Sequence, residues 1–150
     1  MATLVSTLIN TATSPDPYPE RGIHNVTLTL GLLPACPVAR EAASVAFNRP
    51  MTAVSTGSHP GSLPLAGTLF TAESDTGVFS ALIPEEDGVS VRFYSVSDAP
   101  GTVRLSAGLP VKSACLTDLM GNKTGDCTVD GETVTAPIAP RAFAQVKIVF

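Results

Sequence analysis

Residues 78–94 read VFSALIPEEDGVSVRFY and decide the fold of this chain. Two strand-like runs, 78–83 and 89–94, flank the turn Glu86-Asp87-Gly88, and the second run alternates apolar with polar or larger side chains. A period of two places successive side chains on opposite faces of a strand. An acidic residue before Gly supplies the positive φ angle that tight hairpins need. The stretch therefore predicts an antiparallel hairpin.

The same pattern recurs in both directions from this hairpin. Further strand-like runs lie at 26–30, 103–106 and 144–150, and turn residues lie at 98–101, 121–123 and 130–131. Residues 66–150 then hold roughly seven strands at the spacing typical of a sandwich. A shorter strand-rich block covers 3–33. The predicted fold class is all-β, an antiparallel β-sandwich with one short helix near residues 37–47.

The predicted helix interrupts the strand pattern. Residues 37–47 are Ala-rich, begin with Pro37, and place Val38, Ala42, Val45 and Ala46 on one face. Pro is tolerated in a first helical turn, and Asn48 is suited to end the helix.

A long connector follows the predicted helix. The stretch to Leu65 is rich in Pro and Gly and is loop-like. We expect this connector to lie across the sheets, anchored by its apolar residues Met51, Val54, Leu63 and Leu65. The chain thus divides into three parts: 1–33, a helix and connector at 34–65, and a sandwich at 66–150.

Composition and charge exclude several classes of protein. The 150 residues are 44% hydrophobic and 15% charged, with 13 Pro and 12 Gly along the whole length. Disordered chains are polar and charge-rich, and a helical bundle would not tolerate Pro and Gly in every long stretch. The formal charge is −4 and the nine cations are scattered. We therefore expect neither nucleic acid nor membrane as a partner.

Targeting signals are absent from the printed N-terminus. It lacks the cationic start and the continuous apolar segment of a secretory signal, so we expect a cytoplasmic location. No apolar run approaches the roughly 18 to 20 residues that a membrane helix requires.

Three cysteines, Cys36, Cys115 and Cys127, form no CxxC pair. Their odd number and wide spacing favour reduced thiols over a disulfide framework or a metal site. A bridge between Cys115 and Cys127 stays open, because it requires their segments to pair as neighbouring strands.

The sequence contains few residues in patterns typical of catalytic sites. His24 and His59 stand 35 positions apart and in no metal-ligand spacing, and no nucleophile motif is present. Glycoside cleavage needs two carboxylates set roughly 5 to 10 Å apart. The densest acidic run, Glu85-Glu86-Asp87, falls in the predicted hairpin turn, where solvated charge explains it. We predict no catalytic residue and no metal ligand.

One loop gathers polar functional groups in sequence. It contains Asp16, Tyr18, Glu20, Arg21 and His24, directly before the predicted strand at 26–30. A Pro-stiffened loop in which Asp16 and Glu20 cap turns explains the residue content. The alternative is a loop whose side chains hydrogen-bond to a sugar.

Five ordered segments resemble the C-terminal part of glycoside hydrolase family 38 α-mannosidases. They are SPDPYPERGIHNVTLTLGLLP from residue 14, REAASVAFNRPMTAVSTGSHPGSLPLAGTLF from residue 40, VFSALIPEEDGVSVRFYSVSDAPGTVRLS from residue 78, LTDLMGNKTGD from residue 116 and the closing PIAPRAFAQVKIVF. Departures are Ser95 where many members have Asn, Met120 and Gly121 where Glu is common, and 141–144 where Phe-Glu-Ile-Arg is usual.

The resemblance implies a non-catalytic region of a retaining α-mannosidase. The family holds its nucleophilic Asp and its divalent metal, usually zinc, in an N-terminal domain with no counterpart here. By resemblance, 1–33 are the terminal strands of the parent's central sandwich and 66–150 are its C-terminal sandwich. The partners implied are the upstream domains and a mannoside substrate, which residues 16–24 would face. The piece alone is expected to be inactive.

Two other functions are compatible with a sandwich of this kind. A free-standing carbohydrate-binding module would offer an aromatic platform, yet the chain has no Trp and only two Tyr, at positions 18 and 94. A ligand-free structural sandwich would pair with a second copy as a homo-oligomer through open strand edges.

Overall fold

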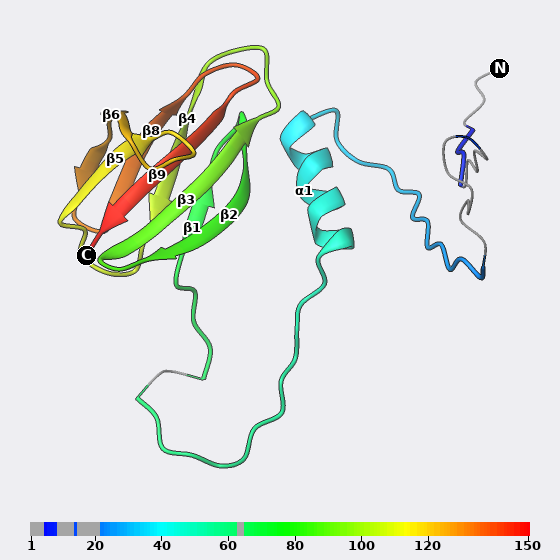
Figure 1. Cartoon of the computed structure of the whole chain (residues 1–150), viewed down its shortest axis with the longest axis horizontal. Coiled ribbons are helices and arrows are strands. Elements are labelled where there is room, and N and C mark those ends of the chain that lie inside the picture. Colours follow the sequence, from blue (N-terminus) through cyan, green and yellow to red (C-terminus); the bar gives the residue numbers. More distant parts are fainter. Residues whose placement is uncertain (1–4, 9–13, 15–21, 63–64) are drawn as a thin grey trace. The chain divides into compact units, whose positions relative to one another are not determined.

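A computed structural model describes residues 5–8, 14, 22–62 and 65–150 of the chain (Figure 1). The chain divides into two units, Met1–Leu32 and Leu33–Phe150. The second unit contains all the regular secondary structure of the described residues. The sequence-based boundaries at residues 33 and 65 stay predictions.

Nine strands and one helix make up the described secondary structure of the second unit. They are α1 (Pro37–Asn48), β1 (Thr71–Glu73), β2 (Gly77–Glu85), β3 (Gly88–Ser95), β4 (Gly101–Ser106), β5 (Ser113–Thr117), β6 (Lys123–Asp126), β7 (Thr128–Asp130), β8 (Thr133–Ile138) and β9 (Phe143–Val149). One sheet has the order β1-β4-β8-β7 and the other has the order β2-β3-β9-β5-β6. Every strand pair is antiparallel. The predicted all-β sandwich with one short helix is confirmed.

The hairpin predicted from residues 78–94 is β2 with β3. Its register runs from Gly77 opposite Ser95 to Glu85 opposite Gly88, and a bulge shifts it between Phe79 and Ala81. A bulge bends and twists a strand locally. The runs predicted at 103–106 and 144–150 correspond to β4 and β9, each within three residues of its predicted bounds.

Two details of the strand prediction were wrong. The turn at 98–101 is not a hairpin, because β3 and β4 belong to different sheets and the chain crosses between the layers there. The structure also has nine strands after residue 65 rather than seven. The shortest, β1 and β7, have three residues each, which is too short for an alternation to be recognised.

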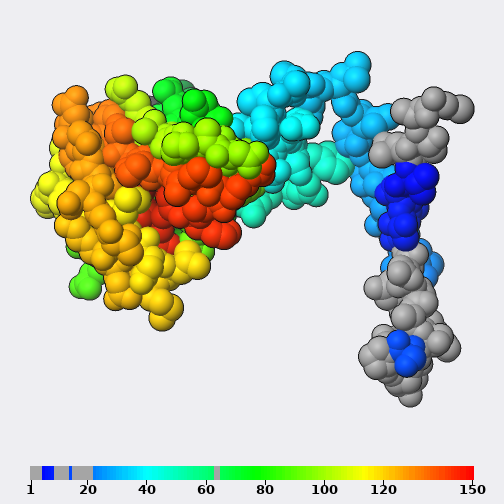
Figure 2. All heavy atoms as spheres, turned by 90° about the horizontal axis from the view of Figure 1, so that it is seen from above, coloured from blue at the N-terminus to red at the C-terminus, as the bar shows by residue number. Residues whose placement is uncertain are grey.

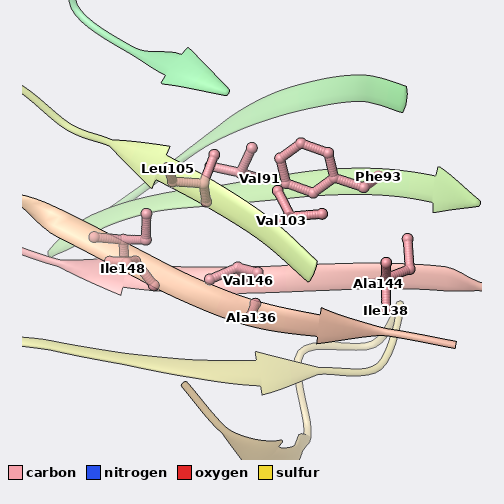
Figure 3. Packing of buried hydrophobic residues seen from close by; sticks show 10 residues of the cluster. Val91, Phe93, Val103, Leu105, Ala136, Ile138, Ala144, Val146 and Ile148 are labelled. Atoms are coloured by element: carbon pink, nitrogen blue, oxygen red, sulfur yellow. The ribbon is translucent and has the colours of Figure 1, made fainter. Parts of the chain in front are cut away.

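The core lies between the two sheets and comes from β3, β4, β8 and β9 (Figure 3). Its members are fully or almost fully buried: Val91, Phe93, Val103, Leu105, Val134, Ala136, Ile138, Ala144, Val146 and Ile148. They occupy alternate positions on each strand, as a sheet with one buried face requires. The other face of β3 and β9 is therefore available for polar side chains.

The helix prediction is confirmed to within one residue. α1 begins at Pro37, as expected for a residue without an N–H, and ends at Asn48. The Asn48 Nδ2 donates to the Ser44 carbonyl oxygen at 2.9 Å. None of its residues is fully buried, so α1 rests on the sandwich rather than inside it.

The expectation of an anchored connector was wrong. Met51 is fully exposed, and Val54 and Leu65 are also solvent-exposed, while Leu63 lies outside the described residues. Isolated apolar residues separated by Pro and Gly cannot bury enough surface to offset the entropy lost on ordering a long loop. This connector does not lie across the sheets.

The strand expected at 26–30 is not present either. Residues 22–33 lie in no strand, and Val26, Leu28 and Leu30 are exposed. An alternating segment becomes a strand only when a neighbouring strand satisfies its backbone groups, and no described strand pairs with it. The local pattern was correct for a strand, but its partner is missing from the described residues.

Limited proteolysis should cut this connector first. Thermolysin is expected to cleave at residues 49–62 and 65–69, because these residues are exposed and lie outside the sheets. A fragment that retains β1 to β9 should persist, since Val146 and its neighbours are inaccessible. Mass spectrometry of the digest identifies the sites. Early cleavage inside β8 or β9 would contradict this order of stability.

The sole α-helix among the described residues, α1, has 12 residues and is not long and apolar enough to cross a membrane.

Candidate functional site

Most of the sugar-facing loop predicted from sequence lies outside the described residues. This holds for Asp16, Tyr18, Glu20 and Arg21. His24 is described and exposed, in the unit Met1–Leu32. A role for these five residues in substrate binding stays a prediction.

Acidic residues of the first hairpin make contacts that stabilise its turn. Glu85 accepts a 2.6 Å hydrogen bond at its Oε1 from the Ser90 hydroxyl, and Asp87 lies 3.2 Å from the Lys147 ammonium. The first contact links the two strands of the hairpin, and the second links its turn to β9. Charge in this turn therefore has a structural explanation, and the carboxylates do not face each other across a cleft.

All three cysteines are free thiols, as the spacing favoured. Cys115 alternates with Ala114 and Leu116, which pack on the core, so its side chain points to the outer face of the sheet. Cys127 itself packs against the core. The two thiols are close enough to interact electrostatically, and they form no disulfide.

Burial also makes Cys127 a poor nucleophile. Removal from water, reinforced by the nearby Cys115 and Asp126, raises the pKa of the Cys127 thiol to about 11. The thiolate is the reactive form of cysteine, so this group stays protonated at neutral pH. Across the part of the chain that the structure describes, no three His, Cys, Asp or Glu side chains group as metal ligands.

A row of polar side chains crosses the outer face of the five-stranded sheet. The register places Arg92 of β3 opposite Gln145 of β9, and Gln145 opposite Thr117 of β5. Figure 2 shows the atoms of β3 and β9 side by side on one face of the sandwich. We name Arg92, Gln145 and Thr117 the polar row.

Hydrogen bonds fix the orientation of every group in the polar row. Gln145 is 5% exposed, and its Nε2 donates to the Thr117 Oγ1 at 3.2 Å and to the Asp118 carbonyl oxygen at 3.3 Å. The Gln145 Oε1 therefore faces Arg92 and accepts from its Nε at 3.0 Å and its Nη2 at 2.8 Å. The two hydrogen bonds to the neutral Gln145 Oε1 therefore fix the orientation of the Arg92 guanidinium.

An aromatic pair stands beside the polar row. Tyr94 and Phe143 are the next cross-strand pair on β3 and β9, with ring centroids 6.4 Å apart. Phe143 is 67% exposed, so most of its ring faces solvent. Aromatic pairs and Arg side chains are enriched where protein surfaces bind other molecules.

Tyr94 of this pair also links the sandwich to the helix α1. Its hydroxyl donates a 2.6 Å hydrogen bond to the Glu41 Oε1 on α1. That hydrogen bond is the main reason why the pKa of Tyr94 is raised above 10.0, with smaller contributions from burial and from the Glu41 charge. The Arg49 Nη1, just after α1, donates to the Ser80 carbonyl oxygen at 3.3 Å.

The Tyr94 contact predicts a pH limit for docking of α1. A raised pKa means that the neutral phenol is favoured in the folded chain, so the contribution is complete below pH 10 and is lost as pH rises through the raised pKa. In a Tyr18→Phe background, absorbance at 295 nm should titrate Tyr94 above its ordinary pKa. Glu41→Gln should lower that midpoint, and the turn variant Glu86→Gln should not. Equal midpoints in all three proteins would contradict the contact.

An apolar groove lies along the edge where β1 and β2 face each other. The helix covers one part, a cavity of about 310 Å³ between the apolar face of α1 and strands β1 and β2. A second part of about 410 Å³ has no cover from α1, and three of its apolar lining residues, Leu69, Phe79 and Leu82, are exposed. Apolar surface of this kind is typical of a contact with another protein segment.

These features suit binding. The described residues bring together hydrogen-bond donors, an aromatic pair and an apolar groove, without a nucleophile beside a general base. Sequence reasoning missed the polar row, because its members lie far apart in the chain and only the strand register joins them. The polar residues that alternate with apolar ones in the runs 89–94 and 144–150 could have indicated a polar outer face on these strands.

Comparisons with known proteins agree with the fold. Residues 78–142 match the family model described as the glycosyl hydrolases family 38 C-terminal beta sandwich domain. No curated protein and no solved structure matches the chain. The matched segment runs from the start of the first hairpin to the turn before β9, and so includes Arg92 and Tyr94. Residues 78–142 of this chain are thus similar to the C-terminal β-sandwich domain of glycosyl hydrolase family 38.

Proposed function

We propose that the chain is the non-catalytic C-terminal β-sandwich region of a retaining α-mannosidase, where it acts as a scaffold and lines the substrate cleft. The observation that carries this proposal is the family match over residues 78–142. The binding features of the sandwich support it, because they suit contact with a larger protein. In this proposal the upstream domains of a cytoplasmic parent supply the nucleophilic Asp and the divalent metal, zinc in most relatives.

The mannoside substrate belongs to the full-length enzyme in this proposal. Residues Asp16, Tyr18, Glu20, Arg21 and His24 are the groups proposed to lie nearest to it. Their hydroxyl, carboxylate, guanidinium and imidazole groups suit hydrogen bonds to sugar hydroxyls.

Complementation in trans tests the proposal. A family 38 α-mannosidase is prepared without the region that matches residues 78–142, and the present chain is added to it. The expected result is restored hydrolysis of a p-nitrophenyl α-mannoside by the mixture, with no hydrolysis by the chain alone. The matched control is the core variant Phe93→Ala, which should not restore activity because its sandwich is destabilised.

Two measurements separate the other candidate functions. Calorimetric titration of the chain with mannose and mannobiose should give no heat of binding, and saturable binding would favour a carbohydrate-binding module. Light scattering should show a monomer, and a stable dimer would favour a structural homo-oligomer. The edge strands support this expectation: β1 and β7 have three residues, β6 has four, and β2 carries a bulge and Pro84. Short, bulged or Pro-containing edges resist strand pairing.

A further inference from the structure

We infer that Arg92 is a carboxylate-binding site on the outer face of the five-stranded sheet, and that its ligand is an Asp or Glu side chain on the upstream region of the parent enzyme. The identity of the partner rests on the proposed function. The existence of the site does not, because it follows from the hydrogen bonds and charges around Arg92 in the chain itself.

The first argument is that a half-buried charge lacks a counterion. Arg92 is mostly shielded from solvent, and its guanidinium bonds only to the neutral Gln145 amide. The ion pairs among the described residues are Lys123–Asp126, Arg141–Asp98 and Lys147–Asp87, and none of them includes Arg92. Charged side chains that leave water are normally paired.

The second argument is that the carboxylates of the chain near this face already have other partners. Glu41 binds the Tyr94 hydroxyl, Glu85 binds the Ser90 hydroxyl, and Asp87 pairs with Lys147. No described carboxylate pairs with Arg92, so we place its ligand outside the described residues.

The third argument is geometric. The Gln145 Oε1 occupies the edge of the guanidinium formed by Nε and Nη2. The end formed by Nη1 and the second N–H of Nη2 has no partner among the described residues. That end presents two parallel donors, the arrangement that a carboxylate accepts in a bidentate manner. Because Gln145 is locked by Thr117 and Asp118, the donors are held in place before binding.

The surroundings favour a protein carboxylate over other anions. Phe143 is exposed beside the polar row and pairs with Tyr94, so the site joins one charge to an apolar surface. Interface centres have this composition of Arg and aromatic residues. The net charge of −4 disfavours polyanions such as nucleic acid.

A matched peptide pair tests the site on the chain as it is. The probes are N-acetyl-Phe-Glu-amide and N-acetyl-Phe-Gln-amide, which differ only in the carboxylate, at equal ionic strength. Titration of the ¹⁵N-labelled chain should give a saturable shift of the Arg92 Nε–H signal and the Gln145 side-chain amide with the Glu peptide. The Gln peptide should bind about tenfold more weakly or worse. Identical responses to both peptides would overturn the site.

The complementation assay then tests the partner. Arg92→Gln should weaken the apparent affinity for the truncated mannosidase by about tenfold to a hundredfold, the loss expected for a charged hydrogen-bonded pair. Arg92→Lys should recover only part of it, because an ammonium cannot donate in parallel. The control Arg104→Gln changes an exposed Arg that faces Glu73 in the other sheet and should leave the affinity unchanged.

The outcomes separate the two proposals. If the unaltered chain fails to complement the truncated enzyme, the proposed function fails, while the peptide titration still decides the site. If complementation succeeds and Arg92→Gln behaves like Arg104→Gln, the assignment of the partner is overturned. A thermal melt of each variant checks that its sandwich is folded, and the titration of the unaltered chain needs no variant.

Discussion

Replacement of Phe93 by Ala is expected to lower the free energy of unfolding by about 3 to 5 kcal/mol. Phe93 is 1% exposed on β3 and packs edge-on against Phe79, with ring centroids 6.1 Å apart at an interplanar angle of 74°. Its loss removes both the apolar burial and the aromatic contact, and leaves a cavity between the sheets. Domains of this size have a total stability of about 5 to 15 kcal/mol, so the variant should be partly unfolded on mild heating.

Chemical denaturation followed by circular dichroism measures this effect. Phe143→Ala is the matched control, since the same side chain is removed from an exposed position on the neighbouring strand. It should cost less than about 1 kcal/mol, because only the pairing with Tyr94 is lost. Similar midpoints for the two variants would contradict the placement of the core.

Replacement of Gly88 by Ala is expected to be the second most damaging change, with a loss of several kcal/mol, on the order of that for a core cavity. A Cβ at this position would overlap the Ile148 carbonyl oxygen on β9. Backbone atoms of a central strand cannot move aside without breaking the hydrogen bonds of β3 with β9. Gly is therefore required here by the close approach of two strands.

The connector offers the matched control for this change. Gly57→Ala adds the same methyl group where no atom lies within 4 Å, and should leave the stability unchanged or slightly raised. Thermal unfolding followed by calorimetry compares the two variants with the unaltered chain. A Gly88→Ala protein as stable as Gly57→Ala would show that β3 and β9 are farther apart than the structure places them.

The sequence predicts local structure well in this protein because the signals are local. The turn Glu86-Asp87-Gly88 and its flanking runs became β2 and β3, and Pro37 and Asn48 mark the ends of α1. Side-chain alternation and the fixed φ angle of Pro act within a few residues. The positive φ expected at Gly88 is not found, and this Gly allows the close approach of Ile148 on β9 instead. The family resemblance was also read from sequence, and the match over residues 78–142 confirms it for that region.

Errors arose where a local pattern needed a distant partner. The run 26–30 has the alternation of a strand and pairs with no described strand, and Met51 has the apolar character of an anchor but remains exposed. The turn at 98–101 has hairpin residues, yet it joins strands of different sheets. Burial and pairing depend on which surfaces meet, and a short segment does not contain that information.

The sequence by itself determined the longer strands of the sandwich, the first hairpin turn, the short helix and the family resemblance of residues 78–142. Only the tertiary structure decided which strands share a sheet and that Arg92 meets Gln145 from 53 positions away. The physical reason is that strand register and side-chain direction are set by hydrogen bonds between distant segments. These bonds leave Arg92 with free donors at its end, which is the basis of the proposed carboxylate site.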